Sequence, residues 1–390
     1  MTHNVPNRNW SYPTAMKFGV GRIAELADHC KAAGIAKPLF VTDKALASLP
    51  ITAEAVAVLS KAGLGSAVFS EVDPNPNEGN MAAGIAAYKA GGHDGVICFG
   101  GGSALDLGKM VALMAHQRAD LSVWDLEDID DWYTRADSAK IAPIVAVPTT
   151  AGTGSEVGRA GVLTNSVTHK KKIIFHPKLM PAVTICDPAL TVGMPRFITA
   201  GTGMDALAHN LEAFCAPFFH PLAAGVALEG MRLIKDNLAT ATKKGKNLEA
   251  RGNMLIASAM GATAFQRGLG AIHALAHPFG GLYDAHHGLL NGIIMPYVLK
   301  ANRKKIEKDI ERAAAYLGIK GGFNGFLKWI LALRKEIGIP HALKDIGIDT
   351  KRLDEIAAMA IKDPSAGGNP IAFTEKQYKS LAKKCLTGDL

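Results

Sequence analysis

The sequence predicts an α/β domain with a parallel sheet, followed by an all-helical domain. Short apolar runs alternate with helical patterns in the first half of the chain, and strand signals vanish after Pro195. A chain of 390 residues is long enough for two domains. Turn-forming Asp-Pro and Gly-Met-Pro segments lie between residues 187 and 195. We therefore expect an α/β domain over residues 1–187 and a helical domain over residues 188–390.

Apolar runs bounded by turn residues predict the strands of the sheet, and they cover residues 38–43, 66–72, 94–100 and 141–150. Between them, residues 51–61 and 80–90 have the spacing of helices. Strands that alternate with helices at this pitch form a parallel sheet with helices on both faces. The continuous apolar character of DGVICFG (94–100) fits a strand that is buried on both sides.

The charge balance favours neither a nucleic acid nor a membrane as a partner. The 43 Lys and Arg exceed the 35 Asp and Glu, for a net charge of +8. The basic clusters lack interleaved aromatic residues and any nucleic-acid motif, so we interpret them as solvated surface. Glycines, prolines and charges interrupt every apolar stretch before it reaches membrane-spanning length.

The cysteines favour a reducing compartment. They are five isolated residues without a CxxC spacing, which argues against a disulfide framework and a thiolate metal site. The N-terminal stretch MTHNVPNRNWSYPTAMKFG lacks the positive region and apolar run of a signal peptide. We therefore expect a cytoplasmic protein.

Two glycine-rich loops follow predicted strands. Gly100-Gly101-Gly102-Ser103 lies between a strand and a helix, where free N–H groups can bind a phosphate. VPTTAGTGSE (147–156) follows another strand and is dense in hydroxyl groups. Two such loops at the carboxyl ends of strands in one sheet are where doubly wound folds bind nucleotides. We favour a dinucleotide site over the alternative, in which the first loop is a tight connection and the second a polar loop.

Asp43 is the last residue of another predicted strand, residues 38–43. A carboxylate in this place accepts a hydrogen bond from the 2′-hydroxyl of a ribose and repels a 2′-phosphate. The alternative is that Asp43 caps the helix that follows it.

A cluster of carboxylate and imidazole groups predicts a metal site. Asp205 and His209 are spaced i, i+4, so they share one face of a helix. HALAHPFGGLYDAHHG (273–288) holds two more histidines at this spacing, then Pro278, which is expected to end or kink the helix, and then a histidine pair in a loop. Nitrogen and oxygen ligands of this kind suit Zn²⁺ or Fe²⁺.

These segments resemble the iron-containing (group III) alcohol dehydrogenases. GGGSALDLGK, PTTAGTGSE, the DALAH segment and GLGAIHALAHPFGGLYDAHHG match that family in order and spacing over almost the whole chain. The resemblance implies a Rossmann-like domain that binds NAD(P) and a helical metal-binding domain, a fold shared with dehydroquinate synthase. It implies an oxidoreductase that transfers hydride between a small alcohol or aldehyde and nicotinamide.

The resemblance also assigns the site residues. The implied metal ligands, for Fe²⁺ or else Zn²⁺, are Asp205, His209, His273 and His287. His287 is chosen because it precedes the glycine of the family's HGxxN pattern, and His286 receives no role. His277 is the implied catalytic proton relay. The implied cofactor-binding residues are Asp43, Asn75, Gly101, Gly102, Ser103, Asp106, Thr149, Thr150, Thr153 and Lys171. Asp43 and Asn75 favour NAD over NADP, and a homodimer or higher homo-oligomer is expected.

Two departures from the family leave the substrate open: AFQRGLG replaces a longer AFNNxGLG run, and Arg159-Ala160 replaces other polar side chains. Phe265 and Phe214 are candidates for the pocket wall, with core packing as the alternative. Two other functions remain possible on these residues. One is a non-redox lyase like dehydroquinate synthase, which uses the same metal and NAD. The other is a metal-dependent hydrolase or non-catalytic metal-binding protein, which has no need of the nucleotide loops.

Overall fold

The computed structural model describes residues 14–168 and 170–390. The expectation about the N-terminal stretch concerns mainly residues 1–13, which lie outside the described residues. The described chain divides into an α/β unit of residues 14–194 and 246–255 and a helical unit of Pro195–Gly245 and Ile256–Leu390. The sequence-based boundary after residue 187 remains a prediction.

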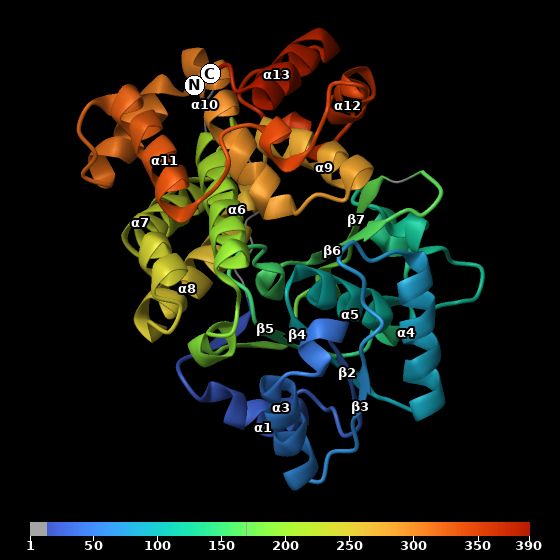
Figure 1. The fold of residues 1–390 in the computed structure, drawn as a ribbon. Helices are drawn as coiled ribbons and strands as arrows, with labels where there is room; N and C mark the ends of the chain where they lie inside the picture. Colours follow the sequence, from blue (N-terminus) through green and yellow to red (C-terminus); the bar gives the residue numbers. More distant parts are fainter. Residues whose placement is uncertain (1–13, 169) are drawn as a thin grey trace, which may run out of the picture. The chain divides into compact units, whose positions relative to one another are not determined.

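The α/β unit is built on a sheet of six parallel strands among the described residues (Figure 1). Their order is β1-β8-β5-β4-β2-β3. The bounds are β1 (Ala15–Phe18), β2 (Pro38–Val41), β3 (Ala67–Phe69), β4 (Gly95–Gly100), β5 (Ile144–Pro148) and β8 (Val183–Cys186). The four predicted strands are confirmed as β2, β3, β4 and β5, and the predicted parallel sheet is confirmed with them.

The strands β2, β4, β5 and β8 are buried on both faces of this sheet. Successive side chains of a strand point to opposite faces, so Phe40 and Ile97 pack with α1 (Leu26–Ala32) and α3 (Pro50–Lys61). Their neighbours in the strands, such as Leu39 and Val96, pack with the helices of the other face, α4 (Glu78–Gly91) and α5 (Gly102–Met114). The register pairs Cys98 of β4 with Ala146 of β5, and both lie in this second core.

The strand order reverses beside β2. The chain runs from β2 to β3 at the sheet edge and then returns to β4 on the other side of β2. The segments that follow β2 and β4 therefore leave the sheet as neighbours at its carboxyl end, which is where doubly wound sheets bind ligands. The segment after β5 is next to them because β5 pairs with β4.

An antiparallel hairpin, β6 (Ala160–Thr164) and β7 (Lys171–Phe175), was not predicted from the sequence. Both strands are only partly buried, and their apolar residues lie beside charged ones, Arg159 before β6 and Lys171 and Lys172 at the start of β7. Leu163 and Ile174 attach the hairpin to the core on the α5 side of the sheet. The short helix α2 (Lys44–Ala47) follows β2.

The helical unit is centred on α6 (Arg196–Cys215), which is buried along nearly its whole length. The other helices are α7 (Pro221–Lys243), α8 (Leu248–Ala264), α9 (Ala271–Tyr283), α10 (His287–Tyr316), α11 (Gly322–Ile337), α12 (Leu353–Ala360) and α13 (Glu375–Thr387). Helix α8 begins in the α/β unit and ends in the helical unit. No strand occurs in the described residues after Cys186, which confirms the helical character predicted for this part.

Close contact between α6 and α10 depends on glycine. A Cβ on Gly288 would lie 2.4 Å from the carbonyl oxygen of Gly201, a distance that no side chain tolerates. Glycine at this position therefore lets the first turn of α10 approach α6, and the residue before it, His287, is brought to Asp205.

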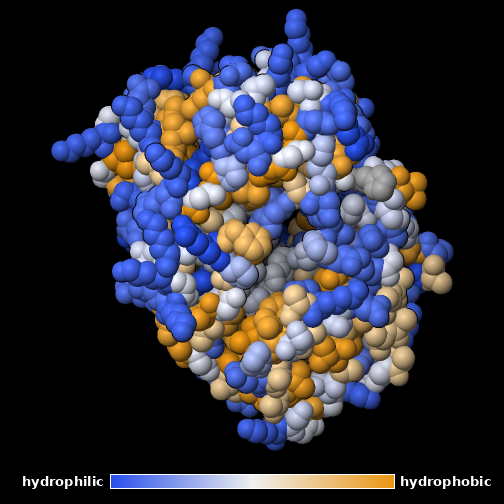
Figure 2. Space-filling view, in the orientation of Figure 1, coloured by the Kyte–Doolittle hydropathy of each residue, from blue (hydrophilic) through white to orange (hydrophobic). Residues whose placement is uncertain are grey.

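The hydropathy of the described residues shows no membrane-spanning segment. No helix there is long and apolar enough to cross a membrane. Figure 2 shows hydrophilic side chains over much of the visible face, with apolar ones in separate groups between them.

Candidate active site

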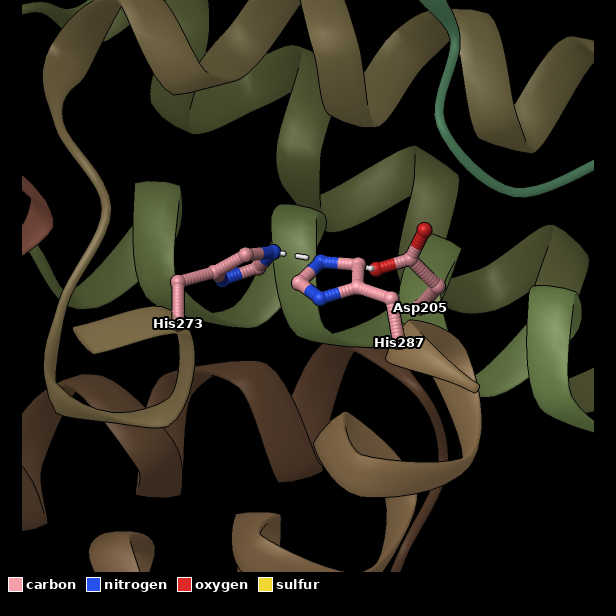
Figure 3. Close-up of side chains that lie close together, drawn as sticks. All are labelled: Asp205, His273 and His287. Carbon is pink, nitrogen blue, oxygen red and sulfur yellow. Dashed lines mark ion pairs between the residues drawn. The ribbon is translucent and has the colours of Figure 1, made fainter. Parts of the chain in front are cut away.

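Three side chains from three helices of the helical unit converge on one point. Asp205 comes from α6, His273 from α9 and His287 from α10, and Figure 3 shows them close together. Their candidate ligand atoms all lie within 4.8 Å of one another. The Nε2 atom of His287 lies 3.6 Å from Oδ1 of Asp205, and Nε2 of His273 lies 3.7 Å from the same oxygen.

The fourth predicted ligand, His209, lies beside this cluster. Its Nε2 atom is 3.9 Å from Oδ1 of Asp205. Its ring stacks on His273 with the centroids 4.6 Å apart and the planes 14° apart. The structure therefore brings the three predicted histidine ligands around one carboxylate oxygen of the fourth, Asp205.

The distances of the three imidazole nitrogens from Asp205 fit a metal ion. Ligands about 2.1 Å from a tetrahedral ion stand about 3.4 Å from one another. The three separations from Oδ1 of Asp205, between 3.6 and 3.9 Å, are close to this value. Three imidazole nitrogens and one carboxylate oxygen are a donor set that both Zn²⁺ and Fe²⁺ accept.

The electrostatics of the cluster favour a negative Asp205 among the imidazoles. Burial acts to raise the pKa of Asp205, but the three histidines outweigh it and hold that pKa well below its usual range. Burial acts to lower the pKa of His273, yet its bonds with Asp205 and Glu212 raise it to about 9. Without a metal, protons bind where the ion would, so metal binding displaces them.

Asn291 belongs to the same cluster, although sequence reasoning gave it no role. Its Nδ2 atom donates a 2.7 Å hydrogen bond to Oδ1 of Asp205. The same nitrogen lies 3.2 Å from Nε2 of His273 and 3.1 Å from Nε2 of His287. Asn291 lies four residues after His287, hence one turn along α10, and this i, i+4 spacing is the signal by which it could have been found.

Of the two effects expected of Pro278, an end of the helix is ruled out because α9 continues to Tyr283, and a kink remains a prediction. The placement of the histidine pair in a loop was wrong for its second member. His287 does not lie in a loop, because it is the first residue of α10. His286 is the N-cap of α10, since its Nδ1 atom accepts a 3.2 Å hydrogen bond from the backbone N–H of Leu289. This capping contact gives His286 a structural role.

His277, the predicted proton relay, lies next to the cluster and is held by a carboxylate. Its ring stacks on His287 with the centroids 5.3 Å apart. Its Nδ1 atom lies 2.8 Å from Oδ2 of Asp363. Burial acts to raise the pKa of Asp363, but the attraction and hydrogen bond of His277 lower it below its usual range. Sequence reasoning missed Asp363.

The first glycine-rich loop connects β4 to α5 in the α/β unit. Gly100 has a φ of +146°, and a Cβ there would lie 2.8 Å from that of Ala104. Helix α5 starts at Gly102 without a side-chain cap, so its first N–H groups are open to a ligand. A Cβ on Gly102 would lie 2.6 Å from the methyl group of Thr153, so the two predicted loops contact each other.

The other predicted cofactor residues lie around these loops. Asp43 caps α2, because its Oδ1 accepts a 2.9 Å hydrogen bond from the N–H of Leu46. The Ser103 hydroxyl donates to the carbonyl oxygen of Pro74 at 2.6 Å, so Asn75, next in the chain, lies close to the start of α5. Thr150 lies close to Gly101, since a Cβ on Gly101 would be 3.3 Å from its methyl group. Thr149 is buried, and Lys171 is the first residue of β7.

The carboxylate of Asp106 makes its hydrogen bonds within the protein. One oxygen accepts a 2.6 Å bond from the hydroxyl of Ser155, and the other accepts from the N–H of Val162 at 3.1 Å. Buried Lys109, one turn further along α5, donates to the carbonyl oxygens of Ser155, Gly158 and Ala160 at 2.6, 2.9 and 2.9 Å. Helix α5 thereby holds the loop after β5.

The candidate pocket residues differ in environment. Phe265 is half-buried, with its ring 5.3 Å from that of His209. Phe214 is completely buried under the guanidinium group of Arg312, which is the core packing given as its alternative. Arg159 lies in the α/β unit, over the ring of Phe175.

Glycine-rich loops at the switch point of a parallel sheet, with a carboxylate–histidine cluster in the helical unit, are typical of an enzyme that binds a nucleotide and a metal ion. Comparison with known proteins agrees: residues 13–188 match the family described as iron-containing alcohol dehydrogenase, and residues 199–386 match its C-terminal family. The chain belongs to the iron-containing alcohol dehydrogenases, as the sequence motifs predicted, and it is an alcohol dehydrogenase of that family.

Relatives match nearly the whole chain. A 4-hydroxybutyrate dehydrogenase of Cupriavidus necator is 35% identical and aligns over 96% of this chain and 99% of its own. The crystal structure of a 1,3-propanediol oxidoreductase superposes with a TM-score of 0.91 at 35% identity, covering 97% of this chain and all of the other. A sulfoacetaldehyde reductase from Bifidobacterium kashiwanohense, solved in complex with NAD+, gives a TM-score of 0.87 at 29% identity, covering 98% and 100%. The lyase and hydrolase alternatives are not favoured by these relatives.

Proposed function

We propose that the chain is an NAD-dependent alcohol dehydrogenase and aldehyde reductase whose Fe²⁺ or Zn²⁺ ion is held by Asp205, His209, His273 and His287. The observation that carries the proposal is the convergence of three imidazole Nε2 atoms on Oδ1 of Asp205, at 3.6 to 3.9 Å. An ion held there supplies Lewis acidity, which lowers the pKa of an alcohol and polarises an aldehyde carbonyl.

The cofactor site is proposed for the loops after β2, β4 and β5. The uncapped N-terminus of α5, with Gly101, Gly102 and Ser103, offers backbone N–H groups to the pyrophosphate. Asn75, Thr149, Thr150, Thr153 and Lys171 are proposed to surround the rest of the nucleotide. The carboxylate of Asp106 is internally bonded, so its contribution is to hold the loop of Ser155.

The preference for NAD over NADP rests on Asp43. Its Oδ1 atom caps α2, and its Oδ2 atom lies near Gly100, 3.8 Å from where a Cβ of that residue would be. The carboxylate therefore lies beside the glycine loop, where it can accept from a ribose 2′-hydroxyl and repel a 2′-phosphate. The solved relative with NAD+ supports this choice.

His277 is proposed to exchange the proton that accompanies hydride transfer. Its Nδ1 atom donates to Asp363, so its Nε2 atom is the one available to a reacting group or to water. The stacking of His277 on His287 brings the imidazole next to the proposed metal ligands.

The proposed substrates are small primary alcohols and the matching aldehydes. Relatives that act on 4-hydroxybutyrate and 1,3-propanediol suggest chains of three or four carbons with a second polar group. The half-buried ring of Phe265 beside His209 supplies an apolar contact for the carbon chain. A homodimer or higher homo-oligomer is proposed from the family.

Metal analysis of the purified protein, followed by an NAD(H)-coupled screen of these alcohols and aldehydes, tests the proposal. We expect one Fe²⁺ or Zn²⁺ per chain and turnover of at least one three- or four-carbon primary alcohol. A protein that binds NADH but oxidises none of these alcohols, with either ion supplied, would contradict it.

A further inference from the structure

Glu212 connects the proposed metal ligand His273 to the start of its helix. The two residues are 61 positions apart in the chain, on α6 and α9, and both are buried. Oε2 of Glu212 lies 2.6 Å from Nδ1 of His273. Its other oxygen, Oε1, accepts a 2.6 Å hydrogen bond from the backbone N–H of Ile272. One carboxylate thus contacts both the imidazole and the backbone of α9.

The backbone contact fixes the beginning of α9. The first N–H groups of a helix have no partner within the helix. Here Glu212 accepts from Ile272, and Asn369 accepts from Ala271 at 3.1 Å. A Cβ on Gly270 would lie 2.9 Å from Oε1 of Glu212, so glycine before the helix is what lets the carboxylate reach it.

The imidazole contact selects the nitrogen that faces Asp205. An ionised carboxylate only accepts hydrogen bonds, so in the neutral imidazole the proton resides on Nδ1. Nε2, which lies 3.7 Å from Oδ1 of Asp205, then keeps its lone pair for a ligand. A carboxylate behind a histidine in this way orients the ring and increases its basicity as a metal ligand.

We propose that Glu212 is the positioning residue of the metal centre: it holds His273 in the tautomer and orientation that bind the ion, and it anchors α9 at the same time. The inference rests on the proposed function, because it takes the ion to be bound at Asp205 and the histidines. Glu212 itself does not contact the ion or the substrate.

Substitution of Glu212 by glutamine gives the sharpest test. The amide has nearly the same shape but only one acceptor, so with its oxygen on the N–H of Ile272 it can only donate to Nδ1 of His273. The proton of the neutral imidazole is then displaced to Nε2, the nitrogen that faces Asp205. Glu212→Asp keeps an ionised acceptor that is one methylene shorter. Truncation to alanine is avoided because it removes both acceptor oxygens at once and cannot separate the imidazole contact from the backbone contact.

Asn369→Ala is the matched control. It removes the other acceptor at the start of α9 and leaves the contact between Glu212 and His273 in place. An effect that comes only from a loosened helix appears in this control. A loss of Zn²⁺ affinity that comes from the contact between Glu212 and His273 does not appear in Asn369→Ala.

The experiment measures Zn²⁺ affinity by competition with a chelator, and the visible spectrum of the Co²⁺-loaded protein, with circular dichroism of each metal-free variant as a check of folding. We expect Glu212→Gln to bind Zn²⁺ about 10- to 100-fold more weakly than wild type and to change the Co²⁺ spectrum. The Zn²⁺ affinity of Glu212→Asp is expected to lie between those of wild type and Glu212→Gln. The Zn²⁺ affinity of Asn369→Ala is expected to stay within about threefold of wild type.

Equal Zn²⁺ affinities of wild type and Glu212→Gln would overturn the inference, and so would an equal loss in Asn369→Ala. If Glu212→Gln does not fold, the comparison of Glu212→Asp with Asn369→Ala decides in the same way. A wild-type protein that binds neither Zn²⁺ nor Co²⁺ overturns the proposed function itself, and this inference with it.

Discussion

The Nδ1 atom of His277 lies 2.8 Å from Oδ2 of Asp363, while Oδ1 of the same carboxylate accepts the backbone N–H of Ser365 at 2.8 Å. Asp363 therefore orients the ring of His277 through its Nδ1 atom, as Glu212 orients the ring of His273. In both cases the carboxylate leaves Nε2 as the imidazole nitrogen that is open to other groups.

We expect His277→Phe to lower kcat by about 100-fold, because the phenyl ring packs but cannot exchange a proton. Metal content and NADH affinity are expected to stay unchanged. Asp363→Asn is the companion variant: its amide still accepts from Ser365 but disfavours the same tautomer of His277. Kinetics over pH 6–10 check both, and wild-type pH profiles in both variants would contradict a proton relay at His277.

Asp43 is expected to set the cofactor preference. Replacement by asparagine removes the negative charge but keeps an oxygen that caps α2. This variant therefore separates the proposed repulsion of a 2′-phosphate from the capping of the helix. We expect Asp43→Asn to bind NADP about tenfold more tightly than wild type, because the repulsion of the 2′-phosphate is lost. Coupled assays with NAD and NADP measure the change in kcat/KM.

Asp43→Gly is the second variant, since it loses both the charge and the cap. Its melting temperature is expected to fall, as loss of a cap costs about 1 kcal/mol. If neither variant changes the ratio of kcat/KM between NAD and NADP, then Asp43 serves only as a cap.

Glu156 makes stability depend on pH. It is buried, one of its carboxylate oxygens has no partner, and burial raises its pKa to about 7. An unfolded glutamate has a pKa of about 4.3. Between these two values the folded protein holds a proton that the unfolded chain has lost, so the free energy of unfolding falls as pH rises through this window.

Glu156→Gln carries no such proton. At pH 8 we expect the variant to be more stable than wild type by up to about 4 kcal/mol, and the difference is expected to vanish near pH 4. Thermal unfolding at pH 4.5, 6 and 8 measures it. The same difference at all three pH values would show that Glu156 does not hold its proton in the folded state.

Lys109 is expected to hold the loop after β5. Its ammonium group is fully buried and bonded to three carbonyl oxygens and the Ser155 hydroxyl. Lys109→Met leaves these acceptors and Asp106 uncompensated, which costs on the order of 3 kcal/mol. We expect weaker NADH binding with unchanged metal content, checked by fluorescence titration and metal analysis. Wild-type NADH affinity in this variant would contradict the role.

Much of the fold was predictable because strand and helix patterns are local. The apolar runs of β2, β4 and β5 are buried on both faces, so each one is visible without knowledge of its neighbours. β1 was missed because its four residues are half-exposed and show no apolar run. β8 is a buried strand that was also missed, because it is only four residues long and runs directly into the Asp-Pro turn.

The candidate ligands were predictable for a similar reason. The i, i+4 spacing of Asp205 with His209 places both on one helix face, and the histidine-rich stretch is conspicuous by composition. Glu212 and Asp363 were not predictable, because they lie 61 and 86 residues from the histidines that they hold. A carboxylate acquires such a role only through packing of separate helices, and nothing in its local sequence indicates the partner.

The proposed activity depends most on the ion proposed at Asp205 and the histidines. The most direct test compares alcohol oxidation by the chelator-stripped protein, by the same protein after addition of Fe²⁺ or Zn²⁺, and by the Asp205→Ala variant. We predict that the stripped protein and the variant lose turnover by more than about 100-fold while both still bind NADH, and that the ion restores the stripped protein only. Full turnover by the stripped protein, or by Asp205→Ala, would contradict the account.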